Sequence, residues 1–327
     1  MHAVKLPFPK NLSRTILALH GDVGRAWLDG LAKLLDACAE RWSLRILPPF
    51  PDLSYNYVAP AVRADGRAVV LKVGVPNPEL LAEMAALRHY AGRGIVQLLD
   101  ADPVWGVLLL ERLVPGTALA TLDDDEEATH IAAGVMRALW RPLPPENAFP
   151  TLERWTAAIG RLRQRFDGTT GPLPARLVEL AEGLLPQLLA SQSEPVLLHG
   201  DLHHLNILRA ERAPWLALDP KGVAGEPAYE VGPFLYNPLP QVATWPDLSR
   251  VLARRVDILS AELGFARERI VAWGIVTAVL SACWSIEDEG EGWEAVLMCA
   301  EALSTWPLGA ASQVLFTAEN AEGCRTG

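Results

Sequence analysis

The chain has 327 residues, of which 50% are hydrophobic and 21% are charged, and its formal net charge is −10. This composition is typical of a globular protein with two domains or lobes and a sizeable core, and it excludes a chain that is disordered as a whole. The negative charge argues against nucleic acid or an anionic membrane as the main partner, because both require clustered Lys and Arg. A cationic small molecule would suit the charge better.

The cysteines and the N-terminal sequence predict a cytoplasmic location. Cys38, Cys283, Cys299 and Cys324 form no CxxC pair and show no regular spacing, which favours reduced thiols. The start, MHAVKLPFPKNL, lacks an apolar segment of signal-peptide length, and no run of 18 apolar residues occurs. We expect an unexported protein without an obligate protein partner.

The first hundred residues contain one helical pattern and then a strand pattern. After a loose start, apolar residues recur at intervals of three and four over 23–43, which predicts an amphipathic helix. Two strand-like runs at 53–61 and 68–73 flank an Asp-Gly dipeptide, which predicts a hairpin. The second run carries Lys72, which is either an edge-strand charge or a functional lysine.

Residues 78–90 have the apolar spacing of a helix and carry Glu79 and Glu83 four residues apart on one face. Kinases use a lysine on a strand to bind the ATP phosphates and hold it with a glutamate on the following helix. Lys72 and this helix have that order. A glutamate at a solvated helix face is the alternative.

Two further strands are predicted at 94–99 and 104–110, and the second leads into Glu111-Arg-Leu-Val-Pro-Gly116. Such a strand-to-linker passage is where a purine pairs with backbone groups. We expect the carbonyl of Glu111 and the amide of Leu113 to do so, unless this is only the last strand of a sheet. The lobe boundary is expected near residue 114.

The rest of the chain is mostly helical in pattern. An acidic run at 123–127 suits the solvated first turn of a helix. Helices are predicted at 128–140, 152–166, 174–189, 248–263, 267–286 and 292–303.

Between these helices lies the segment that carries the chemistry. A hydrophobic run at 196–198 precedes His199-Gly-Asp201, Asn206 follows Asp201 at the interval used by protein kinases, and a second hydrophobic run ends at Asp219. We expect Asp201 to orient a hydroxyl and accept its proton. Asn206 and Asp219 can supply oxygens to Mg²⁺, which takes its other ligands from phosphates and water.

The histidines of this segment have a second interpretation. His199, His203 and His204 could bind zinc, but no further Cys or His lies at a supporting interval. A packed loop that His199 braces is favoured. Lys221 and Gly222 follow Asp219, and Lys221 is a secondary candidate for the phosphates.

The motifs LHGDLHHLNIL, LDPKG and GEPAYEVGPFLYNP resemble the streptomycin 6-kinase and hydroxyurea-resistance branch of the aminoglycoside phosphotransferases, over most of the chain from about residue 20. The resemblance implies a two-lobed, protein-kinase-like α+β fold. The small lobe that contains the sheet and binds ATP would span 1–114, and the larger helical lobe that holds the catalytic residues and the acceptor would span 115–327. It also implies ATP lying between the lobes, Mg²⁺ and O-phosphorylation of a small molecule.

The resemblance also assigns residues. It favours Glu83 over Glu79 as the partner of Lys72. The sequence has no Gly-x-Gly-x-x-Gly before Lys72, so Ser54 and Asn56, with Tyr55 between them, are candidates to cover the phosphates, or else turn residues. The residues expected near the acceptor are Glu226, Glu230, Trp284, Glu287, Asp288 and Glu289.

Three rival functions remain open from the sequence. A protein kinase would need a longer activation segment than 219–232. A catalytically idle nucleotide-binding scaffold would retain the fold without turnover. A kinase of an ordinary metabolite would share every motif, so neither the acceptor nor the choice between resistance and metabolism follows from the sequence.

Overall fold

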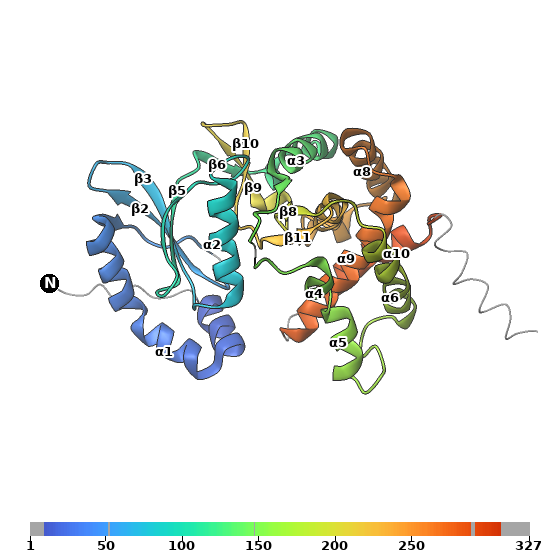
Figure 1. The fold of residues 1–327 in the computed structure, drawn as a ribbon, viewed down its shortest axis with the longest axis horizontal. Coiled ribbons are helices and arrows are strands. Elements are labelled where there is room, and N and C mark those ends of the chain that lie inside the picture. The colour runs from blue at the N-terminus through green and yellow to red at the C-terminus, as the bar shows by residue number, and fades with distance from the viewer. Residues whose placement is uncertain (1–9, 52, 147, 289–291, 309–327) are drawn as a thin grey trace, which may run out of the picture. The chain divides into compact units, whose positions relative to one another are not determined.

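The computed structural model describes residues 10–51, 53–146, 148–288 and 292–308 (Figure 1). Cys324, Glu289 and the start of the chain before residue 10 lie outside the described residues. Contacts between Cα atoms divide the chain into two compact units. The first unit comprises residues 1–117 and 209–221, and the second comprises 118–208 and 222–327.

The first unit is built on a five-stranded sheet with the order β1-β2-β3-β5-β4. Its strands are β1 (Leu44–Ile46), β2 (Tyr57–Arg63), β3 (Ala68–Val73), β4 (Leu98–Asp102) and β5 (Val107–Glu111). The predicted hairpin is confirmed, because β2 and β3 pair antiparallel with Val62 opposite Ala68. The strand expected from residue 94 begins at Leu98 instead.

Helix α1 (Lys10–Trp42) covers one face of this sheet. The predicted helix is present, but it is longer than expected, and a non-helical Gly21 divides it. The expectation of a loose start is therefore wrong for residues 10–22, where Leu12 and Ile16 are fully buried in the core. The sequence pattern from residue 23 did not reveal this extension.

The two-residue alternation of strand β3 places its apolar side chains and Lys72 on opposite faces of the sheet. Val69, Leu71 and Val73 belong to the core that includes α1, so Lys72 points to the opposite face. Helix α2 (Pro78–Tyr90) lies on that face, where Glu83 bonds Lys72. Helix α2 begins and ends where the sequence predicts, at residues 78 and 90. The side chain of Asn77 caps its N-terminus.

The hairpin that ends at Asp219 belongs to the first unit. Strand β10 (Trp215–Ala217) meets Ile95 in a parallel bridge, and the amide of Val96 donates to the carbonyl of Ala217 at 2.8 Å. Two further strands, β9 (Ile207–Ala210) and β6 (Pro115–Ala118), complete a sheet of order β10-β9-β6. A single boundary near residue 114 does not anticipate this return of the chain.

The second unit is mainly helical, with one small sheet of order β11-β8-β7. Its strands are β7 (Arg141–Pro142), β8 (Val196–Leu198) and β11 (Val223–Gly225). Its α-helices are α3 (Asp125–Leu139), α4 (Leu152–Trp155), α5 (Ala158–Arg165), α6 (Ala175–Ala190), α7 (Val231–Leu235), α8 (Leu248–Leu263), α9 (Arg267–Glu287) and α10 (Trp293–Ser304). The predicted helix at 152–166 is thus two helices.

Helix α9 is the centre of the second unit (Figure 1). By length and composition alone it could cross a membrane, but 78% of its apolar window is buried inside the structure. It packs against α5, α6, α7, α8 and α10. Its apolar sequence is therefore explained by its position in the core.

The cap of α2 yields a first prediction. The Asn77 side-chain oxygen accepts a hydrogen bond from the amide of Leu80 at 3.0 Å. Asn77→Ala removes this acceptor, so we expect the free energy of unfolding to fall by about 1 kcal/mol in denaturant titrations. Asn77→Asp, which keeps an acceptor, is the control and should unfold like the wild type. Equal stability of all three proteins would contradict the capping role.

Candidate active site

Lys72 holds a buried positive charge between two carboxylates of the first unit. Its Nζ lies 2.7 and 2.9 Å from the Glu83 oxygens and 3.1 Å from Oδ1 of Asp219. Burial opposes the charged form of Lys72, but Asp219 and Glu83 outweigh it and raise the pKa of the lysine. Lys72 is therefore a fixed cation, with Glu83 as its buried partner.

Asp219 presents a carboxylate to solvent directly after β10. Its side chain is 45% exposed, and its backbone has φ of 59°, a conformation that non-glycine residues rarely adopt. Two residues later, Lys221 forms an ion pair with Glu79. Glu79 thus pairs with Lys221 and Glu83 with Lys72, in agreement with the choice of Glu83.

In the second unit, a buried carboxylate supports the loop that follows β8. Glu230 is fully buried, and its two oxygens accept hydrogen bonds from the amides of His199 at 2.7 Å and Gly200 at 2.9 Å. Gly200 has φ of 86°, which a residue with a side chain rarely adopts. The amide of Asp201 donates to Nδ1 of His199 at 3.3 Å, so His199 also braces the loop.

The loop leaves Asp201 accessible and turns the amide of Asn206. The Asp201 side chain is 39% exposed, which allows a hydroxyl to reach its carboxylate. Asn206 closes the short helix η2 (His204–Asn206), and its Nδ2 donates to the carbonyl of Asp201 at 2.9 Å. Because this bond uses the nitrogen end, the amide oxygen points the other way.

Asn206 in the second unit and Asp219 in the first each carry an oxygen group of the kind that Mg²⁺ prefers. One carboxylate oxygen and one amide oxygen suffice when phosphates and water supply the other positions. Within the described ranges, no group of three or more His, Cys, Asp and Glu side chains could hold a metal on its own.

The structure corrects the roles expected for Glu226 and Glu230. Both were predicted to contact the acceptor, but both are buried. The Glu226 carboxylate accepts from Arg269 at 2.5 and 2.9 Å and from Nε1 of Trp273 at 2.5 Å. Since Glu230 binds the loop amides, both carboxylates have internal partners, and direct contact with an acceptor is not available to them.

The other acceptor candidates lie at the C-terminal end of α9. Trp284 packs edge-on against Trp155, with ring centroids 5.2 Å apart. Nε1 of Trp155 donates to the hydroxyl of Tyr229 at 2.9 Å. Glu287 forms a two-pronged ion pair with Arg161 at 2.8 and 2.9 Å, whereas Asp288 is exposed at the helix end.

The remaining nucleotide candidates lie in the first unit around β3 and β5. The Asn56 side chain packs against Gly74, immediately after β3, and Ser54 precedes it in a partly exposed turn. The Glu111 carboxylate binds Arg212 at 2.5 and 3.2 Å, while Leu113 is buried. The expected adenine contacts of Glu111 and Leu113 are backbone contacts and stay predictions.

Sequence reasoning missed Arg212 and Arg255. Arg212 also donates to the carbonyls of Gly92 at 2.7 Å and Ile95 at 2.9 Å, which ties the 209–221 hairpin to the first unit. Arg255 is fully buried and contacts the loop that carries Asn206. An isolated arginine, whether in a turn as Arg212 is or in a helical pattern as Arg255 is, gives no sequence signal for such a role.

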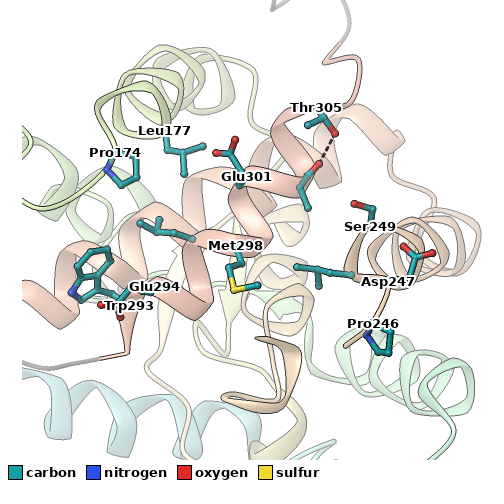
Figure 2. Close-up of a pocket in the computed structure, with 13 residues that line it drawn as sticks. Pro174, Leu177, Pro246, Asp247, Ser249, Trp293, Glu294, Met298, Glu301 and Thr305 are labelled. Carbon is teal, nitrogen blue, oxygen red and sulfur yellow. Dashed lines mark hydrogen bonds between the residues drawn. The ribbon is translucent and has the colours of Figure 1, made fainter. Parts of the chain in front are cut away.

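A surface hollow of about 660 Å³ lies elsewhere in the second unit (Figure 2). Its apolar lining includes Pro174, Leu177, Pro246, Trp293, Leu297 and Met298. Two of its carboxylates are already engaged, since Asp247 caps α8 and Glu301 pairs with Arg176. None of the predicted catalytic residues lines it, so the chemistry does not belong there.

The fold defines the class of protein. The chain superposes on an aminoglycoside phosphotransferase APH(4)-Ia solved with ADP and hygromycin B, with a TM-score of 0.60, 14% identity and coverage of 83% of this chain and 96% of that one. A choline/ethanolamine kinase family protein from Mesorhizobium loti gives 0.61 and 17%, with coverage of 85% and 97%. The fold is protein-kinase-like and α+β, as the sequence predicts.

The family follows from sequence similarity. Residues 50–290 match the family described as aminoglycoside/hydroxyurea antibiotic resistance kinase, and the chain belongs to that family. It is 32% identical to a streptomycin 6-kinase of Streptomyces griseus, over 86% of this chain and 91% of the relative. It is 35% identical to a hydroxyurea phosphotransferase of Kitasatospora aureofaciens, over 86% and 80%. The protein is therefore a kinase, and the predicted family is confirmed.

The buried carboxyl of Glu230 yields a pH prediction. Burial raises the pKa of Glu230 to about 7 from its ordinary 4.5, against the hydrogen bonds from Gly200 and His199. Because the folded pKa lies above the unfolded one, the stability that this group contributes is complete below the unfolded pKa and is lost as pH rises to about 7. The loss should reach about 3 kcal/mol.

Glutamine at this position does not titrate. Between about pH 4 and about pH 8, the wild type should therefore lose about 3 kcal/mol of its free energy of unfolding relative to Glu230→Gln. Denaturant titrations at several pH values measure this difference. Parallel profiles for the two proteins would show that ionisation of Glu230 costs the fold nothing.

Proposed function

We propose that the protein transfers the γ-phosphoryl group of ATP to a hydroxyl of a small cationic molecule of the aminoglycoside or aminocyclitol class, with Mg²⁺ as the required ion. The observation that carries this proposal is the environment of two side chains of the kind that kinases use, Lys72 and Asp201. Lys72 is a buried cation paired with Glu83, and Asp201 keeps an accessible carboxylate on a braced loop. The family membership supports the same reaction class.

Each residue has one task in the proposed reaction. Lys72 binds the phosphate oxygens of ATP, and Glu83 keeps its ammonium in place. Asn206 and Asp219 would hold Mg²⁺, which neutralises phosphate charge when bound. Ser54 and Asn56 cover the phosphates, while the backbone at Glu111 and Leu113 pairs with adenine. Asp201 receives the acceptor hydroxyl.

The proposed phosphoryl transfer involves no covalent enzyme intermediate. The acceptor oxygen forms a bond to the γ-phosphorus as the bond from that phosphorus to the bridging oxygen breaks, and ADP leaves. The hydroxyl proton passes to the Asp201 carboxylate. Catalysis is mainly positioning and charge stabilisation, as phosphoryl transfer generally is.

The acceptor side of the proposal rests on Trp284, Glu287 and Asp288. Trp284 contacts Trp155, which in turn bonds Tyr229. Burial raises the pKa of Tyr229, and the charges of Tyr236, Glu230 and, least of these, Asp201 raise it further. Ammonium or guanidinium groups near the acidic residues would gain charge-assisted hydrogen bonds. A net charge of −10 favours such a ligand.

The streptomycin and hydroxyurea relatives make both acceptor types part of the test. A cytoplasmic location and the absence of a nucleic-acid, membrane or obligate protein partner belong to the same proposal.

The first test concerns Asp201. Asp201→Asn preserves size but removes the proton acceptor, so turnover should fall about 10²- to 10⁴-fold while ATP binding is retained. Mass spectrometry of phosphorylated product with a panel of aminoglycosides, aminocyclitols and hydroxyurea gives the rate, and calorimetry gives the affinity for ATP. A variant as fast as wild type would remove Asp201 from the mechanism.

The metal assignment has its own control in the same assay. Excess chelator should abolish turnover, and added Mg²⁺ should restore it. Product formation at the normal rate in chelator would contradict the roles of Asn206 and Asp219.

The second test concerns the charge of the acceptor. Attraction between partly exposed charges is screened over about 10 Å at 0.1 M salt and about 3 Å at 1 M. Affinity for a cationic acceptor should therefore fall with salt, whereas affinity for a neutral polyol should change little. Calorimetry in low and high salt should also show weaker binding and a smaller salt effect for Asp288→Asn.

Glu268→Gln is the matched control for Asp288→Asn. Glu268 is exposed near the N-terminal end of the same helix α9, so the substitution changes the net charge equally. The two positions are 20 residues apart, about 30 Å along the helix. If both variants weaken binding equally, or if a cationic acceptor binds without salt dependence, the charge has no specific role in recognition.

A further inference from the structure

Arg255 on α8 joins three separate segments of the second unit from a fully buried position. Its Nε and Nη2 donate to Oδ1 of Asp125, the first residue of α3, at 3.0 and 2.6 Å. Its Nη1 donates to three carbonyls after or within α7, at 2.6 to 3.0 Å: those of Phe234, Leu235 and Asn237. The end of α7 thus obtains donors that its own backbone does not supply.

The third segment is the turn that carries Asn206. Nη2 of Arg255 lies 3.2 Å from Nε2 of His204, the first residue of η2. A guanidinium nitrogen only donates, so Nε2 of His204 accepts and the ring proton is on Nδ1. The imidazole ring stacks on Phe234, with centroids 4.1 Å apart and planes 13° apart. Arg255 and Phe234 therefore fix both the direction and the plane of the ring.

The polar character of His204 is not explained by packing. Its Nδ1 is buried without a hydrogen-bond partner in the described chain, and a buried unpaired N–H destabilises the fold. A phenyl ring would stack on Phe234 without that cost. The bond from Arg255 to Nε2 is the interaction that a phenyl ring would lose.

We infer that Arg255 is a positioning residue, which acts through His204 to set the turn η2 and thereby the direction of the Asn206 amide. Asn206 is two residues from His204 in the same turn, and its Nδ2 bonds the carbonyl of Asp201. A displaced turn would alter both groups. This inference rests on the proposed function, in which Asn206 binds Mg²⁺.

The test compares His204→Phe, Arg255→Lys and their double variant with wild type. Calorimetry measures the binding of a non-hydrolysable ATP analogue over a series of Mg²⁺ concentrations, and steady-state kinetics separates kcat from the acceptor KM. Residues that orient a metal ligand typically change metal affinity or activity by about 10- to 100-fold. We expect about tenfold weaker Mg²⁺-dependent binding and lower kcat in both single variants, with the acceptor KM unchanged.

Two further results distinguish positioning from support of the fold. His204→Phe should keep the thermal midpoint of wild type, because the ring still stacks on Phe234, and removal of the unpaired Nδ1–H offsets the unpaired N–H that is left on Nη2 of Arg255. The double variant should have about the same Mg²⁺ affinity as the single variant that binds Mg²⁺ less tightly, because both substitutions break the same hydrogen bond between Arg255 and His204. Additive losses in the double variant would contradict a shared pathway.

Arg254→Lys is the matched control. Arg254 is adjacent on α8 and binds the same Asp125 carboxylate at 3.3 Å, and its other partner is Glu126. Its ion pairs do not include His204, so the variant should show normal Mg²⁺ dependence even if it is less stable. Equal loss of Mg²⁺ binding in Arg254→Lys and His204→Phe would overturn the inference.

Asn206→Ala serves as the reference variant. If it weakens Mg²⁺-dependent binding and His204→Phe does not, the positioning role is wrong and the proposed function stands. If Asn206→Ala leaves the Mg²⁺ dependence unchanged, the metal assignment in the proposed function is wrong, and the inference fails with it.

Discussion

The buried ammonium of Lys72 constrains the first unit more than any other group. An ion removed from water needs close partners of opposite charge, and loss of one partner typically costs about 3 to 5 kcal/mol. Glu83 can meet this need only if α2 lies on the face of β3 opposite the α1 core. Asp219 meets it only if the 209–221 hairpin returns to the same unit, which Arg212 secures by binding Glu111 and two carbonyls. The buried charge of Lys72 and the architecture around it are therefore one requirement.

In the second unit, buried side chains stabilise the loop that carries Asp201. A tight loop leaves amides that helices and strands do not pair, and each needs an acceptor when buried. Glu230 accepts from two of them, while Arg255 donates to carbonyls at the end of α7 and to His204. Buried acceptors and donors thus fix the backbone, and Asp201 remains accessible. Acidic residues near an active site do not all contact a bound molecule, because some of them accept hydrogen bonds that keep the surrounding backbone in place.

The difference between Glu83 and Glu226 shows where residue patterns succeed and where they fail. Glu83 sits in a helix whose ends and face follow from local spacing, and the family resemblance favoured it over Glu79 as the partner of Lys72. The pairing of Glu83 with Lys72 is observed. Glu226 and Glu230 are also acidic and lie in a family motif, but their partners Arg269, Trp273 and the loop amides are distant in sequence or belong to the backbone. Sequence spacing does not show whether a carboxylate already has an internal donor.

The sequence alone determined the β2–β3 hairpin and helices α2 and α8, because these depend on local periodicity and turn chemistry. The kinase-like α+β fold and the family followed from the resemblance of its motifs to a known family. Only the tertiary structure decided that the 209–221 hairpin belongs with the N-terminal residues, that residues 10–22 are helical and that Glu230 and Arg255 are buried supports. Each of these features depends on long-range contacts that satisfy a buried charge, a strand edge or an apolar face. Such contacts are set by the whole packed chain, and a local window of residues does not contain them.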